Sequence, residues 1–314
     1  MNLQQMEYIV ALDKYRHFVL AAEACGVTQP TLSAMIQKLE EELDVKIFER
    51  SRRSVVPTSI GVKIIRQAQT ALNETQRIKE VVADETDAMN GSLHIGIVPT
   101  IAPYIVPDFI YHFQHAYPNM KLHLDERDNK GLLQELAYGN LDMIMTTSPL
   151  EGTSLLEIPV YVERFVVYFS EGCQWDTLPS GPGMLLPADQ MWVLKEGHCV
   201  HGEANSFCKN QEVGNHVYEA GSIETLIRIV DRNGGYTIIP ELHVGFLTDK
   251  QREHVHPIES MPSPQRRISI FLKEDFVRER AVNAVRETLL KIIPARMLDE
   301  RFGKHDIRLR RSRN

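Results

Sequence analysis

The chain has 314 residues, of which 43% are hydrophobic and 25% charged, and its formal net charge is −7. This length allows about two domains with separate cores, and the negative charge excludes a polycation that binds nucleic acid over its whole surface. No apolar run approaches the ~18 residues that a membrane helix needs, and the N-terminus lacks the features of a signal peptide. We therefore expect a cytoplasmic protein with no membrane partner.

The N-terminal segment predicts helices joined by a tight turn. Apolar residues recur at helical spacing over residues 3–13, and a second short helix fits residues 19–25. A turn follows at Gly26, and Thr28 is the expected N-cap of a third helix that has Pro30 in its first turn. A helix, a glycine turn and a polar-faced helix together predict a helix-turn-helix, whose second helix enters the major groove of DNA.

The polar face of the third helix and the basic segment after it carry side chains suited to DNA. Amide and hydroxyl groups hydrogen-bond base edges, whereas guanidinium groups suit phosphates. A helical hairpin with a solvated face is the alternative, and the acidic residues between positions 40 and 44 should face away from a duplex. The predicted DNA-binding residues are Thr28, Gln29, Pro30, Thr31, Ser33, Gln37, Lys38, Arg50, Arg52 and Arg53.

A longer stretch of this segment, residues 21–61, resembles the winged helix-turn-helix of the LysR-type transcriptional regulators. The likeness rests on Ala21, Ala22, Thr28, Gln29, Pro30, Ser33, Leu39, Glu40, Phe48, Arg50, Thr58 and Gly61. Asp44 stands where this family usually has glycine, and aspartate can adopt the left-handed backbone conformation needed there. The resemblance implies a regulator of transcription whose partners are double-stranded promoter DNA and RNA polymerase.

A long helix is expected to begin after Thr58 and to run to about Asp87. Small and apolar residues recur along it at alternating spacings of four and three, which predicts a coiled-coil-like contact. A helix that lies on its own domain is the alternative. The predicted dimerisation residues are Ile64, Ala68, Ala71, Thr75, Ile78 and Val82. The resemblance implies an antiparallel pair of linker helices in a homodimer, and commonly a homotetramer.

From Gly91 onward, segments of strand and helix character alternate along the chain. Strands are expected at 92–98, 121–126, 141–147, 164–170, 191–194, 236–240 and 266–272, and helices at 103–115, 130–139, 222–235 and 275–293. This alternation predicts a doubly wound α/β domain with a parallel sheet. The resemblance implies two Rossmann-like subdomains that share a hinge, as in periplasmic binding proteins.

Two places in this α/β part suit a small ligand. Ligands of open α/β sheets bind at the carboxyl ends of the strands. Thr100 follows one expected strand, and the loop 195–201 follows another. The architecture therefore predicts a small-molecule cleft lined by Thr100, His198 and Cys199.

The segment GHCVHGEANSFC holds Cys199 and Cys208, with His198 and His201 beside the first cysteine. A zinc site, two free buried cysteines and a redox pair are three interpretations. Zinc ligands usually come in pairs about two to four residues apart at both ends, whereas the second end here is a lone cysteine. A thiolate favoured by a cation such as Arg266 would attack the O–O bond of a peroxide, and the resulting sulfenic acid condenses with a nearby thiol.

The likeness continues through LHIGIVPT, GSIETL and RRISIFL, and nearly the whole chain is similar to the peroxide-sensing members of the LysR-type family. This resemblance implies that hydrogen peroxide oxidises Cys199, the peroxidatic cysteine, which then forms a reversible disulfide with Cys208, the resolving one. The expected peroxide-binding residues are Thr100, Asn129, His198 and Arg266. Asn129 stands where the family often has a hydroxyl residue. The disulfide would remodel the regulatory domain and its oligomer, activate antioxidant genes, and be reduced by glutaredoxin or thioredoxin, without a metal or cofactor.

The sequence predicts four successive parts of the chain and leaves two alternative functions open. The fold class is α/β with an N-terminal all-α winged helix-turn-helix, at 1–58, followed by a linker helix at 59–90, a redox-sensing regulatory domain at 91–301 and a solvated basic tail at 302–314. The regulatory domain divides into subdomains at about 91–161 with 266–301, and about 162–265. The alternatives are a regulator that responds to a metabolite in the cleft, and a thiol peroxidase. An enzyme would not need a DNA-reading segment, so we expect a transcription factor.

Overall fold

The computed structural model describes residues 1–50, 55–85, 90–148, 150, 154–172, 190–194, 217–218, 222–258 and 264–309. The chain divides into two compact units. One comprises Met1–Asp87 with Ala137–Asn140, and the other comprises Ala88–Leu136 with Leu141–Asn314. Within the described ranges, none of the helices combines the length and the apolar character that crossing a bilayer requires.

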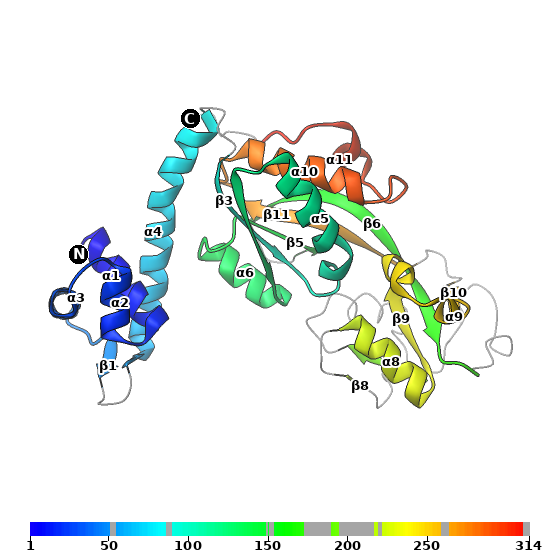
Figure 1. Ribbon diagram of the computed structural model, residues 1–314, viewed down its shortest axis with the longest axis horizontal. Helices are drawn as coiled ribbons and strands as arrows, with labels where there is room; N and C mark the ends of the chain where they lie inside the picture. The colour runs from blue at the N-terminus through cyan, green and yellow to red at the C-terminus, as the bar shows by residue number, and fades with distance from the viewer. Residues whose placement is uncertain are drawn as a thin grey trace. The chain divides into compact units, whose positions relative to one another are not determined.

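The first unit is a helical domain with a two-stranded wing (Figure 1). Its described elements are α1 (Leu3–Tyr15), α2 (Phe18–Ala24), α3 (Gln29–Leu43), β1 (Phe48–Arg50), β2 (Val55–Pro57) and α4 (Ser59–Glu85). β1 and β2 pair antiparallel, with Phe48 opposite Pro57. Leu32, Ile36 and Leu39 of α3 are fully buried in the core of this unit, so this helix has a buried apolar face besides its polar one. The predicted winged helix-turn-helix is confirmed.

Asp44 ends α3 in the way the sequence predicts. Its backbone adopts the left-handed conformation, with φ of 50°, and its N–H bonds the carbonyls of Glu40 and Glu41. Aspartate tolerates this conformation better than most residues that carry a Cβ atom. The turn that the LysR-type pattern makes with glycine is therefore made here without it.

The second unit is built on one mixed sheet with helices packed against it (Figure 1). Its elements are β3 (Gly91–Ile97), α5 (Ala102–Ala116), β4 (Met120–Glu126), α6 (Asn129–Ala137), β5 (Met143–Ser148), β6 (Leu155–Phe169), β7 (Val193–Leu194), β8 (Val217–Tyr218), α8 (Ile223–Asn233), β9 (Tyr236–Pro240), η3 (Glu241–Phe246), α9 (Asp249–Arg252), β10 (Val255–Pro257), β11 (Gln265–Lys273), α10 (Glu279–Ile292) and α11 (Glu300–Lys304). The strand order in the sheet is β10-β6-β11-β5-β3-β4, with β9 paired to β6. β7 and β8 form a separate parallel pair.

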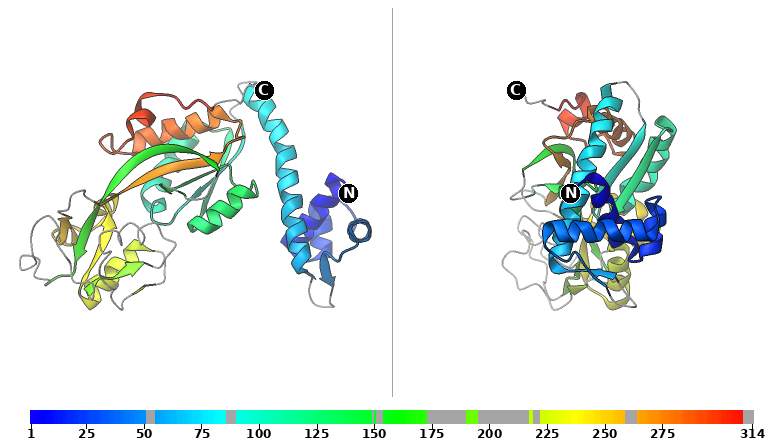
Figure 2. Two further views of the ribbon diagram at one scale, coloured as in Figure 1. Left: turned by 180° about the vertical axis from the view of Figure 1, so that it is seen from behind. Right: turned by 90° about the vertical axis from the view of Figure 1, so that its left-hand side faces the viewer.

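The expectation of a parallel sheet is wrong for part of this unit. β3, β4 and β5 are parallel, but β11 runs antiparallel to both β5 and β6. β6 and β11 lie side by side over a long distance (Figure 2). The first half of β6 pairs with β11, and its second half pairs with β9 and β10. β6 therefore passes from one half of the sheet into the other, so the two halves of the unit share a continuous strand.

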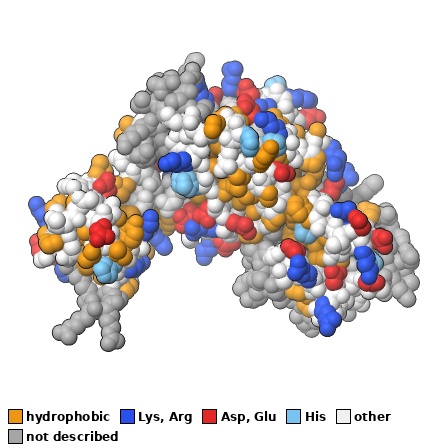
Figure 3. Space-filling model, in the orientation of Figure 1, with side chains coloured by type: hydrophobic (Ala, Val, Ile, Leu, Met, Phe, Trp, Pro, Cys, Tyr) orange, Lys and Arg blue, Asp and Glu red, His pale blue; other side chains and the backbone are white. Residues whose placement is uncertain are grey.

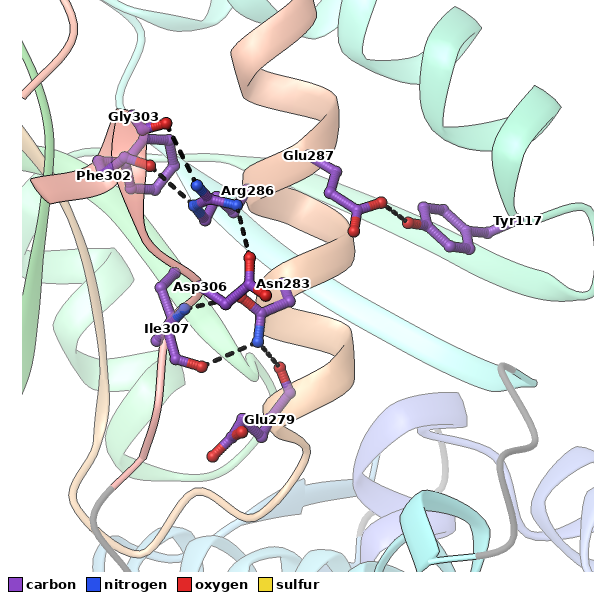
Figure 4. A network of polar contacts seen from close by, with 9 residues as sticks. All are labelled: Tyr117, Glu279, Asn283, Arg286, Glu287, Phe302, Gly303, Asp306 and Ile307. Atoms are coloured by element: carbon purple, nitrogen blue, oxygen red, sulfur yellow. Dashed lines mark hydrogen bonds and ion pairs between the residues drawn. The ribbon is translucent and has the colours of Figure 1, made fainter.

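The chain from α11 to Leu309 is part of the fold, contrary to the expectation of a solvated tail over these residues. Phe302 of α11 is buried, and Ile307 and Leu309 pack against the core of the second unit. The side chain of Asn283 on α10 forms hydrogen bonds with both the N–H and the carbonyl of Ile307, at 2.8 and 2.9 Å (Figure 4). Arg286 donates to the carbonyl of Phe302, at 2.7 Å, and pairs with Asp306, at 3.0 Å.

Candidate functional site

The face of α3 predicted to contact DNA is exposed. Thr28, Gln29, Pro30, Thr31, Gln37 and Lys38 are exposed, and Ser33 is half-buried. Thr28 occupies the N-cap position, but its hydroxyl pairs with the hydroxyl of Thr31, at 2.8 Å, and not with a backbone N–H. The backbone of Arg50 lies in β1, whereas its side chain and the whole of Arg52 and Arg53 fall outside the described residues. Acidic and basic side chains are interspersed over the surface shown in Figure 3.

Glu40 of α3, the first of the acidic residues expected to face away from a duplex, is buried and points into the first unit. The Oε1 atom of Glu40 accepts the N–H groups of Ile47, at 2.8 Å, and Phe48, at 3.1 Å. These are the residues where the chain enters the wing, so the buried carboxylate fixes the start of β1. The signal was present in the sequence, because Glu40 follows Leu32 and Ile36 at steps of four and thus falls on the buried stripe of the helix.

Thr58 and Gly61 join the wing to α4. The Thr58 hydroxyl donates to the carbonyl of Lys46, at 2.6 Å, and accepts the N–H of Gly61, at 2.9 Å. A Cβ atom at Gly61 would lie 2.0 Å from the carbonyl oxygen of Ile47, which is closer than atoms can approach. The Thr-x-x-Gly pattern therefore has a physical cause: threonine caps the helix, and glycine lets it start against the wing.

The predicted dimerisation seam on α4 does not form one uniform face. Ala68 is buried within the core of the first unit, and Ile64 packs against the same core. Ala71 and Thr75 are half-buried, and Ile78 is 66% exposed. The side chain of Val82 falls outside the described residues. The early positions of the seam therefore lie on their own domain, while Ile78 offers apolar surface.

The strand register of the second unit brings four polar residues to one edge of the sheet. Ile97 of β3 lies opposite Glu126 of β4 and Met145 of β5, so the residues after these positions emerge at the same edge. These residues include Thr100, Asn129 and Thr146. β11 begins at this edge, since Arg267 lies opposite Ser148, and Arg266 precedes Arg267 on the same strand. The sequence-predicted residues Thr100, Asn129 and Arg266 are thus brought together.

Arg266 is the centre of this edge. Its guanidinium is fully buried and donates to the hydroxyl and the carbonyl of Thr100, both at 3.0 Å. On its other side it forms an ion pair with Glu163, at 2.7 Å, which is also fully buried. Asn129 is held by a hydrogen bond from the hydroxyl of Thr146. Glu163 and Thr146 were not predicted from the sequence.

The remaining members of the predicted site, His198, Cys199 and Cys208, lie outside the described residues, as does Cys173. Cys25, the C-cap residue of α2, is a half-buried free thiol, and burial raises its pKa, with the nearby charge of Glu7 adding to the effect. It therefore suits the role of a small packing residue. In the part of the chain that the structure describes, no three His, Cys, Asp or Glu side chains gather as metal ligands would.

A cavity of about 480 Å³ lies close to this edge, between α5 on one side and α8 and η3 on the other. Tyr104, His243 and Phe246 line it, and the Tyr104 hydroxyl meets Nδ1 of His243 at 2.8 Å. Burial lowers the pKa of His243 to about 4, so its imidazole is neutral near pH 7 and can accept this hydrogen bond. Thr100, the one described residue of the predicted small-molecule cleft, is fully buried and does not line this cavity.

Comparisons with known proteins agree with this architecture. Residues 3–62 match the bacterial regulatory helix-turn-helix protein, lysR family, and residues 86–292 match the LysR substrate binding domain. The chain is 36% identical to a hydrogen peroxide-inducible genes activator of Haemophilus influenzae, over 86% of this chain and 90% of that one. It is 34% identical to the DNA-binding transcriptional dual regulator OxyR of Escherichia coli, over 97% and 98%.

Solved structures give the same result. A full-length OxyR variant from Pseudomonas aeruginosa superimposes with a TM-score of 0.76 at 30% identity, covering 96% of this chain and 98% of that one. A hydrogen peroxide-bound mutant of OxyR from Corynebacterium glutamicum gives a TM-score of 0.59 at 25% identity, over 93% and 92%. The two family matches together span most of the sequence, and the relatives align along nearly their full length. The chain therefore belongs to the LysR family of DNA-binding transcriptional regulators.

Proposed function

We propose that this regulator senses hydrogen peroxide through Cys199 and activates genes of the antioxidant response. The observation that carries the proposal is the buried contact between Arg266 and Thr100 at the edge of the sheet, where a cation and a hydroxyl stand together out of bulk water. Relatives that are peroxide-inducible gene activators support the same function. The cytoplasm is the proposed location.

The direction of the chain before β7 supports the proposal that Cys199 and Arg266 act together. β7 is preceded by Met191, which forms a parallel bridge with Tyr236 at the start of β9. β9 ends at Pro240, and just beyond it the N–H of Leu242 donates to Glu163, the partner of Arg266. Because this bridge is parallel, the chain that leads into β7 runs in the direction of β9, toward the end where Leu242 meets Glu163. Cys199 follows β7 by a few residues.

The proposed chemistry is a two-step oxidation. The Cys199 thiolate attacks one oxygen of hydrogen peroxide, the O–O bond breaks, and the second oxygen leaves as water after taking up a proton. The Cys208 thiol then attacks the sulfenic sulfur, which releases a second water and forms the disulfide. A dithiol reductant, glutaredoxin or thioredoxin, returns two electrons and both protons. Thr100, Asn129, His198 and Arg266 would hold and polarise the peroxide.

The DNA-binding part of the proposal assigns promoter contacts to the exposed face of α3 and to the wing. Thr28, Gln29, Pro30, Thr31, Ser33, Gln37 and Lys38 would contact the major groove, and Arg50, Arg52 and Arg53 the phosphates. A homodimer or homotetramer would present two such faces to two half-sites and recruit RNA polymerase. Because Ile64 and Ala68 pack on their own unit, the partner contact along α4 would centre on the later residues Ala71, Thr75, Ile78 and Val82.

Thiol mapping tests the proposal directly. Peptide-resolved mass spectrometry of the reduced chain, before and after one equivalent of hydrogen peroxide, should find a disulfide between Cys199 and Cys208 in protein that contains no zinc. A Cys199→Ser variant should keep its fold and lose the response of DNA binding to peroxide, while the matched Cys25→Ser variant should keep both. Thiols that stay free, or one zinc per chain, would refute the proposal.

The cavity beside Tyr104 and His243 favours one second candidate, a regulator that responds to a small metabolite. In that case a ligand should raise the melting temperature of the chain, and peroxide should leave DNA binding unchanged. The thiol peroxidase alternative loses support, because the family consists of transcription regulators. Multiple-turnover consumption of peroxide by the purified chain would revive it.

A further inference from the structure

The cavity between α5, α8 and η3 is bordered by two separate hydrophobic cores. Ile223, Ile227 and Leu247 line it and are buried in the core built around α8 and β9. Tyr104 of α5 also lines it, and its side chain packs against this core and against the larger core of the unit. The volume of about 480 Å³ lies within the range of cavities that bind small organic molecules. The cavity therefore offers an apolar surface to the body of such a ligand.

Three aromatic rings that line this cavity lie close to one another. The ring centre of Tyr104 is 5.6 Å from that of His243 and 5.3 Å from that of Phe246, and the centres of the last two are 6.2 Å apart. The side chain of Phe246 is 61% exposed, so part of its ring is open to a ligand. The faces of aromatic rings attract cations, and groups of such rings recognise ammonium ions in this way.

The histidine in this aromatic group does not repel a cation. Burial lowers the pKa of His243 to about 4, although the charge of Glu224 acts in the opposite direction. The imidazole is therefore neutral at pH 7, and its Nδ1 atom can accept the Tyr104 hydroxyl at 2.8 Å. Burial raises the pKa of Tyr104, so this hydroxyl stays protonated at pH 7 as well. All three rings are uncharged at this pH.

The charged side chains among the described residues of this cavity leave one carboxylate without a cation. Glu126, at the end of β4, lines the cavity together with Glu224 and Arg228 of α8. Arg228 donates to Glu224 at 2.5 Å, so the charge of this guanidinium is already compensated. Glu126 is exposed and, among the residues that the structure describes, forms no hydrogen bond or ion pair. An anionic ligand would be repelled by Glu126, whereas a cationic ligand would be attracted.

We propose that this cavity binds a small organic cation, an amine with an apolar or aromatic body. The ammonium group would neutralise Glu126, and the body would pack against the aromatic rings and the apolar side chains of α8. Neither Thr100 nor Arg266 lines the cavity, and the inference requires neither Cys199 nor peroxide. It goes beyond the proposed peroxide response and gives the ligand of the metabolite-responsive alternative a chemical class.

Three probes with the same aromatic body test the preference for positive charge. Phenethylamine is an ammonium ion at neutral pH, 2-phenylethanol is neutral, and 3-phenylpropionate is an anion. Ligand-observed NMR titrations of the full, reduced chain without DNA give the three dissociation constants. Phenethylamine should bind about five- to tenfold more tightly than 2-phenylethanol, because it adds an ion pair and a cation–π contact to the same body. The anion should bind more weakly than the alcohol.

Three variants locate the binding. Glu126→Gln keeps the shape of the side chain and removes its charge, so it should weaken phenethylamine binding by about three- to fivefold and leave 2-phenylethanol unchanged. Glu274→Gln is the matched control, because Glu274 is exposed in the turn after β11 and does not line the cavity, so neither probe should respond. Phe246→Leu should weaken the amine and the alcohol alike, because it removes a ring that both would contact.

Three results would overturn the inference. They are phenethylamine that binds no more tightly than 2-phenylethanol, equal effects of Glu126→Gln and Glu274→Gln, and amine binding that Phe246→Leu does not change. All three substitutions are at exposed positions, so the variants should fold. Failure of the proposed function looks different, because these titrations use no peroxide. A chain that forms the disulfide but binds no amine would keep the peroxide response and lose the cation site.

Discussion

Replacing Glu40 by alanine should destabilise the DNA-binding unit more than any substitution on its exposed face. The carboxylate is 2% exposed and accepts two backbone N–H groups, from Ile47 and Phe48. Hydrogen bonds to a charged group contribute about 1.5–3 kcal/mol each, and the alanine variant would leave both N–H groups buried without an acceptor, so the expected loss is about 3–5 kcal/mol. The ion pair with Lys46 adds little, because that lysine side chain is 70% exposed.

A glutamine at the same position separates hydrogen bonding from charge. Both N–H groups bind the same oxygen, Oε1, so the amide carbonyl of Glu40→Gln can keep both bonds and the loss should be only about 1 kcal/mol. Urea unfolding gives the free energies, and amide hydrogen exchange resolved at Ile47 and Phe48 gives the local effect. Equal losses for the two variants, or unchanged exchange at these amides in the alanine variant, would refute the argument.

Three other outcomes are expected. Gly61→Ala should cost at least about 2 kcal/mol in urea unfolding because its Cβ would meet a carbonyl oxygen at 2.0 Å, whereas Gly303→Ala, with open space around it, should be neutral or stabilising. The pKa of His243 is lowered to about 4 in the folded chain, while the unfolded value is about 6.5, so the unfolded state binds more protons between these values and stability falls as the pH drops through that window. A His243→Gln variant measured at pH 7 and pH 5 should lose part of that slope, and an unchanged slope would argue against a neutral imidazole. In a binding-site selection, Arg50→Ala should weaken DNA binding evenly, whereas Gln29→Ala should relax specificity at one base pair; identical behaviour would mean that α3 is not the recognition helix.

The elements that depend on local signals were predicted closely, and those that depend on distant pairing were not. The strand at 236–240 has the predicted limits, and Asp44 makes the predicted left-handed turn. β6 begins at Leu155, well before the predicted start at residue 164. Pro159 interrupts the strand pattern, and the register between β6 and β11 shifts there, beside Ser269. Only the pairing with β11 makes this segment a strand.

The polar residues at the edge of the sheet show the same difference between local signals and distant pairing. Thr100 and Arg266 are 166 residues apart, and the position of Thr100 after a strand together with the family likeness was enough to predict both. Glu163 was missed, because its role comes from lying opposite Arg266 in an antiparallel pair that the sequence did not predict. Glu40 differs, since the helical period alone places it on the buried face.

Because the chain is synthesised from its N-terminus, the two units can complete their folding at different times. The first unit takes nearly all its residues from the start of the sequence, so it can fold while the rest is being made. The second unit cannot, because β11 fills the middle of its sheet and the segment after α11 binds Asn283 and Arg286 of α10 (Figure 4). Its contacts with Asn283 and Arg286 form only after residues 300–307 have left the ribosome. A nascent chain can thus hold a finished DNA-reading module before the module that regulates it exists.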